Sequence, residues 1–199
     1  PPTASFERRP RHWNSAAPSA KERAAPQLGE QVCRVGVARQ AAPQGLHWLD
    51  VDNKEMHSDT ELLLMFSSRN ELIQNKIIPA LNKGSWVVSD RFTDASFAYQ
   101  GGGRMLDLNR ISKLESWVLG EFQPNLTLFL DVSVDVGMQR VEARAAKDRI
   151  ELEERAFFER VRSVFIDRSK SYPERIKLID ASGSISEIHN NIKLFLAVL

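Results

Sequence analysis

From residue 59 onward, apolar residues with helical spacing and short apolar runs alternate along the chain. Apolar positions three to four residues apart predict helices, and short runs rich in branched residues predict strands. The predicted helices are 60–81, 108–122, 134–146, 151–169 and 185–196, and the predicted strands are 85–89, 126–132 and 176–179. This alternation implies right-handed crossovers and an α/β fold in which helices flank a parallel sheet.

Residues 1–48 follow a different pattern. They hold six of the nine prolines and almost no sustained apolar periodicity, so we predict no strand there. Prolines at positions 10, 18, 26 and 43 oppose any helix or central strand that would pass through them. The composition fits a disordered arm, and a frameshifted coding sequence is the alternative.

Length and charge narrow the classes of function. With 199 residues and 42% hydrophobic residues, the chain suffices for one large domain. Its 27 basic and 26 acidic residues leave a net charge of +1, which gives no general attraction to nucleic acid or to an anionic membrane. The single Cys33 cannot form an internal disulfide, and there is neither a secretory signal nor an apolar run of about 18 residues. We therefore expect a cytoplasmic protein.

The most informative stretch is the run from Ser89 to Arg104, SDRFTDASFAYQGGGR. It places Asp90 and Arg91 at the carboxyl end of the predicted strand 85–89, where open parallel sheets bind ligands. Hydroxyl groups, an amide and three glycines follow. Because a guanidinium offers a planar fork of donors to phosphate oxygens, this stretch predicts a site for a phosphorylated small molecule.

Four segments together resemble the bacterial thymidylate kinase family. They are TELLLMFSSR (60–69), DRFTDASFAYQGGGR (90–104), PNLTLFLDV (124–132) and KDRIE (147–151). The resemblance implies a P-loop kinase fold with a parallel five-stranded sheet, a homodimer, and transfer of the ATP γ-phosphoryl group to dTMP with Mg²⁺. We expect one nucleoside-monophosphate-kinase-like domain over 1–199, with 1–48 aberrant and 49–199 family-like.

Helix 60–81 carries an arginine on its apolar stripe. The stripe consists of Leu62, Phe66, Arg69, Ile73 and Ile77. From the residues alone, the Arg69 side chain could simply extend to a surface carboxylate. The resemblance implies instead that Arg69 clamps the dTMP phosphate, and that Met65 occupies a position that stacks on thymine.

The resemblance also assigns roles within the run that follows strand 85–89. Arg91 resembles the catalytic arginine on the phosphate side, and Asp90 is expected to organise Mg²⁺ and its water shell. Ser96 and Gln100 are expected to hydrogen-bond the base edges, while Tyr99 lies against the sugar, where a 2′-hydroxyl would clash.

The glycines at 101–103 lack the strand and helix context of a phosphate cradle, so we expect a flexible turn without a phosphate. Further along, Arg160 and Arg162 follow two aromatic residues on helix 151–169, and we expect structural roles for both.

The segment 140–149 resembles the family's lid over ATP. Arg140 and Arg144 lie four residues apart on one helix face, and Arg149 lies in the KDRIE loop. Positive charge here would meet the charge of the transferring phosphoryl group. The alternative is a solvated helix face, because Glu142 and Glu151 are interspersed. We favour the lid, with a catalytic role for Arg149.

The phosphate loop expected near the amino terminus is missing. Its form is GxxGxGK[ST], but residues 8–16 read RRPRHWNSA, with Asn14, Ser15 and Ala16 where lysine and the hydroxyls belong. Ser5–Glu7 resembles the end of the preceding strand. Codons for 8–13 read one base out of frame permit the lost glycines, and codons for 36–40 shifted by two bases permit Gly-Gly-Thr-Pro. We infer frameshifts, which coding DNA unable to encode the loop in any frame would disprove.

Three functions follow from these features. The first is dTMP phosphorylation by ATP in dTTP synthesis, which the lost loop would impair in this chain. The second is a non-catalytic remnant that binds dTMP only. A related deoxynucleoside kinase is the third, although AYQGGGR and DRIE favour a monophosphate acceptor. The four histidines have no metal-ligand spacing, so we assign no metal site to the protein beyond the Mg²⁺ that accompanies ATP.

Overall fold

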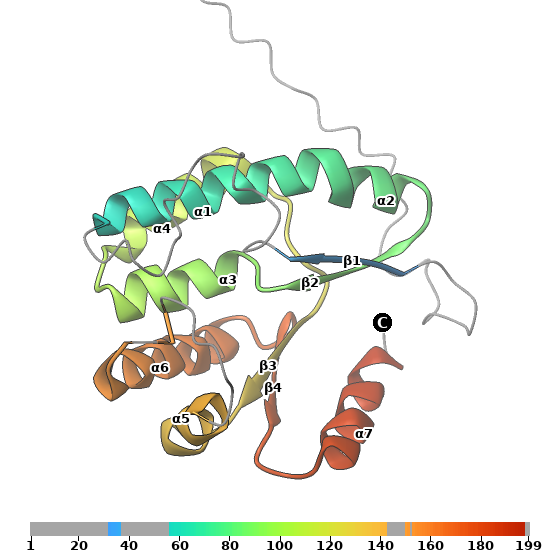
Figure 1. Cartoon of the computed structure of the whole chain (residues 1–199). Helices are drawn as coiled ribbons and strands as arrows, with labels where there is room; N and C mark the ends of the chain where they lie inside the picture. The colour runs from blue at the N-terminus through green and yellow to red at the C-terminus, as the bar shows by residue number, and fades with distance from the viewer. Residues whose placement is uncertain (1–31, 37–55, 143–149, 152, 198–199) are drawn as a thin grey trace, which may run out of the picture.

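The computed structural model describes residues 32–36, 56–142, 150–151 and 153–197 (Figure 1). In chain order the elements are β1 (Val32–Gly36), α1 (Ser58–Leu72), η3 (Ile73–Ile77), α2 (Ile78–Asn82), β2 (Trp86–Asp90), α3 (Thr93–Ser96), η4 (Phe97–Gly103), α4 (Leu108–Leu119), β3 (Thr127–Asp131), α5 (Val134–Glu142), α6 (Arg155–Ser171), β4 (Ile176–Asp180) and α7 (Ile185–Leu196). None of these helices is both long and apolar enough to span a membrane.

The strands form two parallel pairs. β1 pairs with β2, with Gly36 opposite Asp90, and β3 pairs with β4, with Asp131 opposite Asp180. Within the described residues these are two separate two-stranded sheets, so the expected five-stranded sheet is not seen as one body. The fold is nevertheless α/β with parallel strands, as the alternation of elements predicted.

The prediction of no strand within residues 1–48 was wrong, because β1 lies there. The five-residue run alternates Cys33, Arg34 and Val35, and the Val35 side chain is buried in the core while Arg34 is exposed. So short a run has no periodic neighbours that would mark it as a strand. Its pairing with β2, which begins at Trp86, is what stabilises this run as a strand.

α1, η3 and α2 follow one another without a break and replace the predicted helix 60–81. Every member of the predicted stripe is buried: Leu62, Phe66, Arg69 and Ile73 are 2% exposed, and Ile77 is 4% exposed. The four apolar members of the stripe belong to the same core cluster as Val35 of β1. The prediction for this face is therefore confirmed, including its buried arginine.

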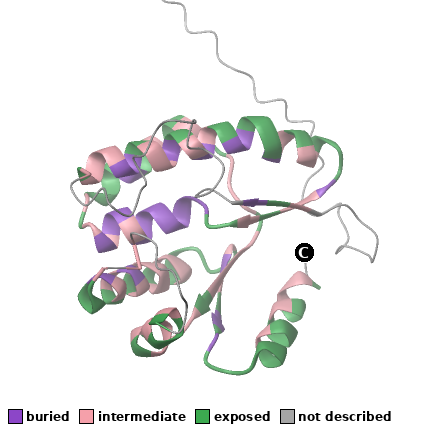
Figure 2. Cartoon of the chain, in the orientation of Figure 1, coloured by how far each residue is buried: buried purple, intermediate pink, exposed green. Residues whose placement is uncertain are grey.

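α3 and η4 form a helical run that the sequence analysis did not predict. The run is buried along nearly its whole length (Figure 2), and its three glycines are helical rather than a flexible turn. A Cβ on Gly103 would lie 2.4 Å from the Phe157 ring, and one on Gly102 would lie 2.7 Å from Val164. Arg160 donates to the carbonyl oxygens of Gly102 and Gly103 at 3.2 and 2.9 Å. The glycines are needed because η4 packs directly against α6.

A buried carboxylate ties this helical run to the second sheet. Asp94 of α3 is 2% exposed and accepts hydrogen bonds from Arg168 at 2.8 Å and from Arg175 at 2.6 and 2.8 Å. Burial by itself would raise the pKa of Asp94, but the hydrogen bonds and charges of Arg175 and Arg168 hold it below its usual value. This cluster joins α3, α6 and the approach to β4.

The remaining helices lie close to their predicted limits. α4 ends at Gly120, whose φ of +60° stops the helix, and α7 matches its predicted bounds. Ser184 and Glu187 form a capping box at the start of α7. α6 begins at Arg155 instead of residue 151. In Figure 1, α5 and α6 lie on one side of β3–β4 and α7 lies on the other.

Candidate functional site

Arg69 is the most unusual side chain of the core. The residue is 2% exposed, and its guanidinium lies 4.8 Å from the centre of the Phe66 ring and 5.7 Å from that of Phe92. Nη2 donates to the Phe92 carbonyl and to Ser96 Oγ, both at 3.1 Å. Burial lowers the pKa of Arg69 to about 10, so the group is still charged at neutral pH.

Two of the Arg69 nitrogens, Nε and Nη1, have no hydrogen-bond partner in the described structure. Buried polar groups are nearly always hydrogen-bonded, and two charged donors without partners lower the stability of the folded protein. The cost is explained if an acceptor oxygen of a ligand completes the set. Arg69 is therefore the centre of the candidate site.

The same face of α1 continues toward its amino terminus through Met65 and Glu61, each four residues from the next. Met65 is half-buried against the core, while Glu61 is 1% exposed. Glu61 Oε1 accepts a hydrogen bond from Gln100 Nε2 at 2.8 Å. Arg69 bonds to Ser96 and Glu61 accepts from Gln100, so α1 and the α3–η4 run lie side by side and antiparallel.

Arg104 closes this end of the site. Its Nη2 lies 3.4 Å from Glu61 Oε2, its Nη1 lies 2.5 Å from Glu153 Oε1, and its guanidinium lies 5.2 Å from the Phe157 ring centre. Glu61 and Arg104 were not predicted as site residues from the sequence. The spacing of four between Glu61, Met65 and Arg69 was the available signal for Glu61, and Arg104 ends the glycine motif.

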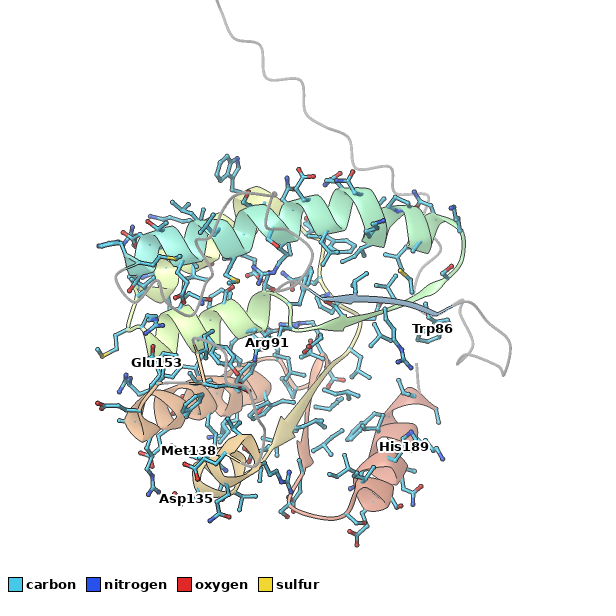
Figure 3. The ribbon with its side chains drawn as sticks, viewed as in Figure 1. Trp86, Arg91, Asp135, Met138, Glu153 and His189 are labelled. Carbon is cyan, nitrogen blue, oxygen red and sulfur yellow. The ribbon has the colours of Figure 1, made fainter. Side chains whose placement is uncertain are left out.

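A second group lies at the carboxyl end of β2. Asp90 and Arg91 are both exposed there, and Arg91 occupies the left-handed region with a φ of +64°. That conformation costs about 1 kcal/mol for a residue other than glycine. The Arg91 guanidinium lies 4.8 Å from the Tyr99 ring centre, near the middle of the molecule (Figure 3). The turn thus aims Arg91 back toward the helix that carries Ser96 and Gln100.

Tyr99 connects this group to a neighbouring cavity. Its ring lies 6.3 Å from the rings of Phe157 and Phe165 and lines a pocket of about 230 Å³. The pocket is lined mainly by β3, α5 and α6, and most of its lining is apolar. Beside it, Arg162 donates to both carboxylate oxygens of Asp131 at 2.6 and 2.8 Å.

Only one of the residues predicted to bind ATP lies within the described structure. Arg140 of α5 donates to the carbonyl oxygen of Ala181, after β4, at 3.1 Å. Outside the described residues lie Arg144, Arg149, Asn14, Ser15 and Ala16. Among the described residues, no three His, Cys, Asp or Glu side chains gather where they could hold a metal ion.

Comparisons with known proteins give a consistent result. The family model for thymidylate kinase matches residues 45–192. A thymidylate kinase of Ruthia magnifica is 60% identical over 151 residues, covering 76% of this chain and 74% of that protein. One from Nitrosospira multiformis is 51% identical over 144 residues, covering 72% and 70%.

A solved structure agrees at the level of the fold. The crystal structure of thymidylate kinase from Ehrlichia chaffeensis superposes with a TM-score of 0.65 at 24% identity, covering 83% of this chain and 81% of that one. The family match over most of the chain and the extended identity to these relatives show that this chain belongs to the thymidylate kinase family.

Proposed function

We propose that the protein is built to move the γ-phosphoryl group of ATP to dTMP. An oxygen of the dTMP phosphate forms a bond to the γ-phosphorus as the bond to the β,γ-bridging oxygen breaks, which yields dTDP and ADP. The observation that carries the proposal is the charged, buried Arg69 with two unpartnered donors, next to Ser96, in a chain of this family.

The geometry changes the part of dTMP that we assign to Arg69. The family resemblance implied that Arg69 binds the phosphate and Ser96 the base, yet the two side chains are hydrogen-bonded to each other. Arg69 is also enclosed by Phe66 and Phe92, whereas the reacting phosphate must be open to ATP. We therefore assign Arg69 to a carbonyl oxygen of the base, together with Ser96.

The other acceptor-side roles follow from position. Met65 lies on the α1 face between Arg69 and Glu61 and would pack on the thymine ring. Gln100 would contact the base edge, and Tyr99 would lie against the sugar. The partly buried Tyr99 ring next to the Arg91 guanidinium supports this order, since it connects the base end to the phosphate end.

Arg91 and Asp90 form the phosphate end. The exposed Arg91 fork would hold the dTMP phosphate and meet the charge that spreads over the transferring group. Asp90 fits Mg²⁺, because this ion usually combines one or two carboxylates with phosphate oxygens and several waters. When bound, Mg²⁺ neutralises part of the phosphate charge. Arg140, Arg144 and Arg149 would cover ATP as a lid.

Three broader expectations belong to the same proposal. A fifth strand that pairs with both β2 and β3 would join the two sheets, and the sequence places the end of such a strand at Ser5–Glu7. Trp117 on α4, 81% exposed, supports a covered face in a homodimer. We also propose a cytoplasmic location.

The altered sequence at 8–16 favours one alternative, a remnant that binds dTMP without transferring phosphate. Arg8, Arg9 and Arg11 add charge there, but without the glycines they supply no backbone nest for the ATP phosphates, and Asn14 cannot replace the cation of the lysine. Calorimetric titrations with dTMP and with ATP, beside an assay of dTDP formation, separate the two. Binding of both with dTDP formation supports the kinase, and binding of dTMP alone supports the remnant. Binding of neither contradicts both.

A further inference from the structure

We propose that Ser89 is a positioning residue that holds the backbone of Arg91 in the conformation from which its guanidinium meets a nucleotide phosphate. This inference rests on the proposed function, because it concerns the phosphate end of the same site. Ser89 acts through Arg91 and not by contact with the nucleotide.

The Arg91 backbone needs a restraint. Among the described residues, only Arg91 and Met105 combine a side chain with a positive φ, which is +64° for Arg91. This left-handed conformation is unfavourable for a residue with a Cβ, because the Cβ crowds the following carbonyl oxygen. A free turn would relax to a right-handed or extended conformation, and the Arg91 side chain would then leave the backbone in another direction.

Ser89 supplies a restraint on the carboxyl side of Arg91. The half-buried Ser89 lies in β2, opposite Val35 of β1, and its Oγ donates a hydrogen bond to the Arg91 carbonyl oxygen at 2.8 Å. This bond ties the carbonyl group after the turn to the strand before it. It therefore opposes rotation of the Arg91 backbone out of the left-handed region.

The residue after the turn is fixed independently. Phe92 is 9% exposed, and its carbonyl oxygen accepts hydrogen bonds from Arg69 Nη2 at 3.1 Å and from the Ala95 N–H at 3.2 Å. β2 thus holds the chain before Arg91, and the core holds it after Arg91. Between these two anchors, the Ser89 hydroxyl holds the Arg91 carbonyl oxygen.

A fixed backbone matters here because the Arg91 side chain is long and exposed. Its guanidinium lies 4.8 Å from the Tyr99 ring centre, so this contact at the tip and the Ser89 bond at the backbone together define where the donors lie. An arginine that is already oriented loses less conformational entropy when it binds an anion. Loss of the Ser89 bond should therefore weaken the phosphate contact and leave the base contact unchanged.

The test compares dTMP with thymidine, which lacks the phosphate. The ratio of the two affinities isolates the phosphate contact, and calorimetric titration of the full chain measures it without ATP. We expect this ratio to fall about threefold to fivefold in Ser89→Ala, the worth of roughly one hydrogen bond, while the affinity for thymidine changes by less than about twofold. Ser89→Thr keeps the hydroxyl group and should keep the wild-type ratio.

Two controls separate positioning from a general loss of structure. Ser171→Ala removes a hydroxyl group that donates to the Asp167 carbonyl oxygen at 2.9 Å on α6, and its dTMP-to-thymidine ratio should match the wild type. The second control repeats Ser89→Ala in an Arg91→Ala protein. Because the guanidinium is gone, removal of the Ser89 hydroxyl should cause no further fall in the ratio.

The outcomes are distinct. A wild-type protein that prefers dTMP and a Ser89→Ala protein with the same ratio would overturn this inference and leave the proposed function standing. An equal loss of affinity for dTMP and thymidine, or an undiminished effect of Ser89→Ala in the Arg91→Ala protein, would also overturn it. A wild-type protein that binds neither compound overturns the proposed function and the inference together.

Discussion

Arg69 Nη2 donates to Ser96 Oγ at 3.1 Å, and this bond joins two helices across the buried centre of the molecule. One nitrogen of the Arg69 guanidinium bonds to α3, and the other two have no hydrogen-bond partner in the described structure. Unpartnered buried donors lower the stability of the fold, but they are available to bind a ligand. In the proposed function, Arg69 links the packing of the core to nucleotide binding.

Replacing Arg69 with methionine should separate these two effects. We expect the Arg69→Met protein to lose about 100-fold in dTMP affinity, because hydrogen bonds from a charged donor are worth about 1.5–3 kcal/mol each. Its free energy of unfolding should change by less than about 1 kcal/mol, since relief of a buried cation offsets two lost hydrogen bonds. Titration calorimetry and urea denaturation measure the two quantities.

Arg110→Met is the control for that experiment. Arg110 is exposed and pairs with Asp59 at 2.9 Å on the surface. The affinity for dTMP should remain within about twofold of the wild type, because surface ion pairs contribute little. Equal losses in the Arg69 and Arg110 variants would show that Arg69 makes no direct contact.

Asp94 should make stability depend on pH in the acid range. Its pKa is lowered in the folded protein, so its contribution is fully present above the unfolded pKa of about 3.9 and is lost as the pH falls through the folded value. Asp94→Asn should lower the free energy of unfolding at pH 7 by about 3–5 kcal/mol, because Arg168 and Arg175 lose their buried counterion.

Urea denaturation at pH 7 and pH 3 checks the dependence on Asp94. The difference in stability between wild type and Asp94→Asn should be largest at pH 7 and should shrink toward pH 3. Asp167→Asn serves as the comparison, because Asp167 forms only an exposed pair with Lys170 at 3.8 Å. A gap between wild type and Asp94→Asn that stays constant over this range would contradict the role given to the carboxylate.

Gly103→Ala should destabilise the contact between η4 and α6. The added methyl group would lie 2.4 Å from the Phe157 ring, and overpacking of this kind costs about 1–3 kcal/mol. Gly137→Ala in α5 is the matched control, because its Cβ would meet nothing nearer than 3.8 Å and alanine favours a helix. Thermal denaturation should show a lower Tm for the first variant only. Equal shifts would mean that η4 and α6 can separate easily.

Restoring the phosphate loop should restore catalysis. A chain with Arg8→Gly, Arg11→Gly, Trp13→Gly and Asn14→Lys regains the glycine pattern and the lysine that bind ATP phosphates. We expect ATP-dependent dTDP formation at least about 1,000-fold faster than in the unrepaired chain. Chromatographic detection of dTDP measures it. A repaired chain that binds both nucleotides but remains inactive would argue against the assigned acceptor residues.

Local patterns were sufficient for the elements that carry their own signal. The apolar stripe from Leu62 to Ile77 predicted the face of the long helix, because burial on a helix repeats every three to four residues. The capped helix 185–196 matched its bounds for a similar reason. The family, too, could be identified from short motifs, because base and phosphate contacts require particular residue types at close spacing.

Contacts between distant segments decided the rest. β1 is a strand because it pairs with β2, and the glycines of η4 are helical because α6 packs against them. Arg69 was predicted on the apolar stripe, but its bond to Ser96 and its two unpaired nitrogens depend on how α1 faces α3. Glu61 is buried beside Gln100 and Arg104 only because the fold brings these distant segments together. The sequence by itself determined the periodic helices and the family, whereas the tertiary structure decided which polar groups are buried together. The physical reason is that burial and charge pairing arise between residues that the chain separates by tens of positions.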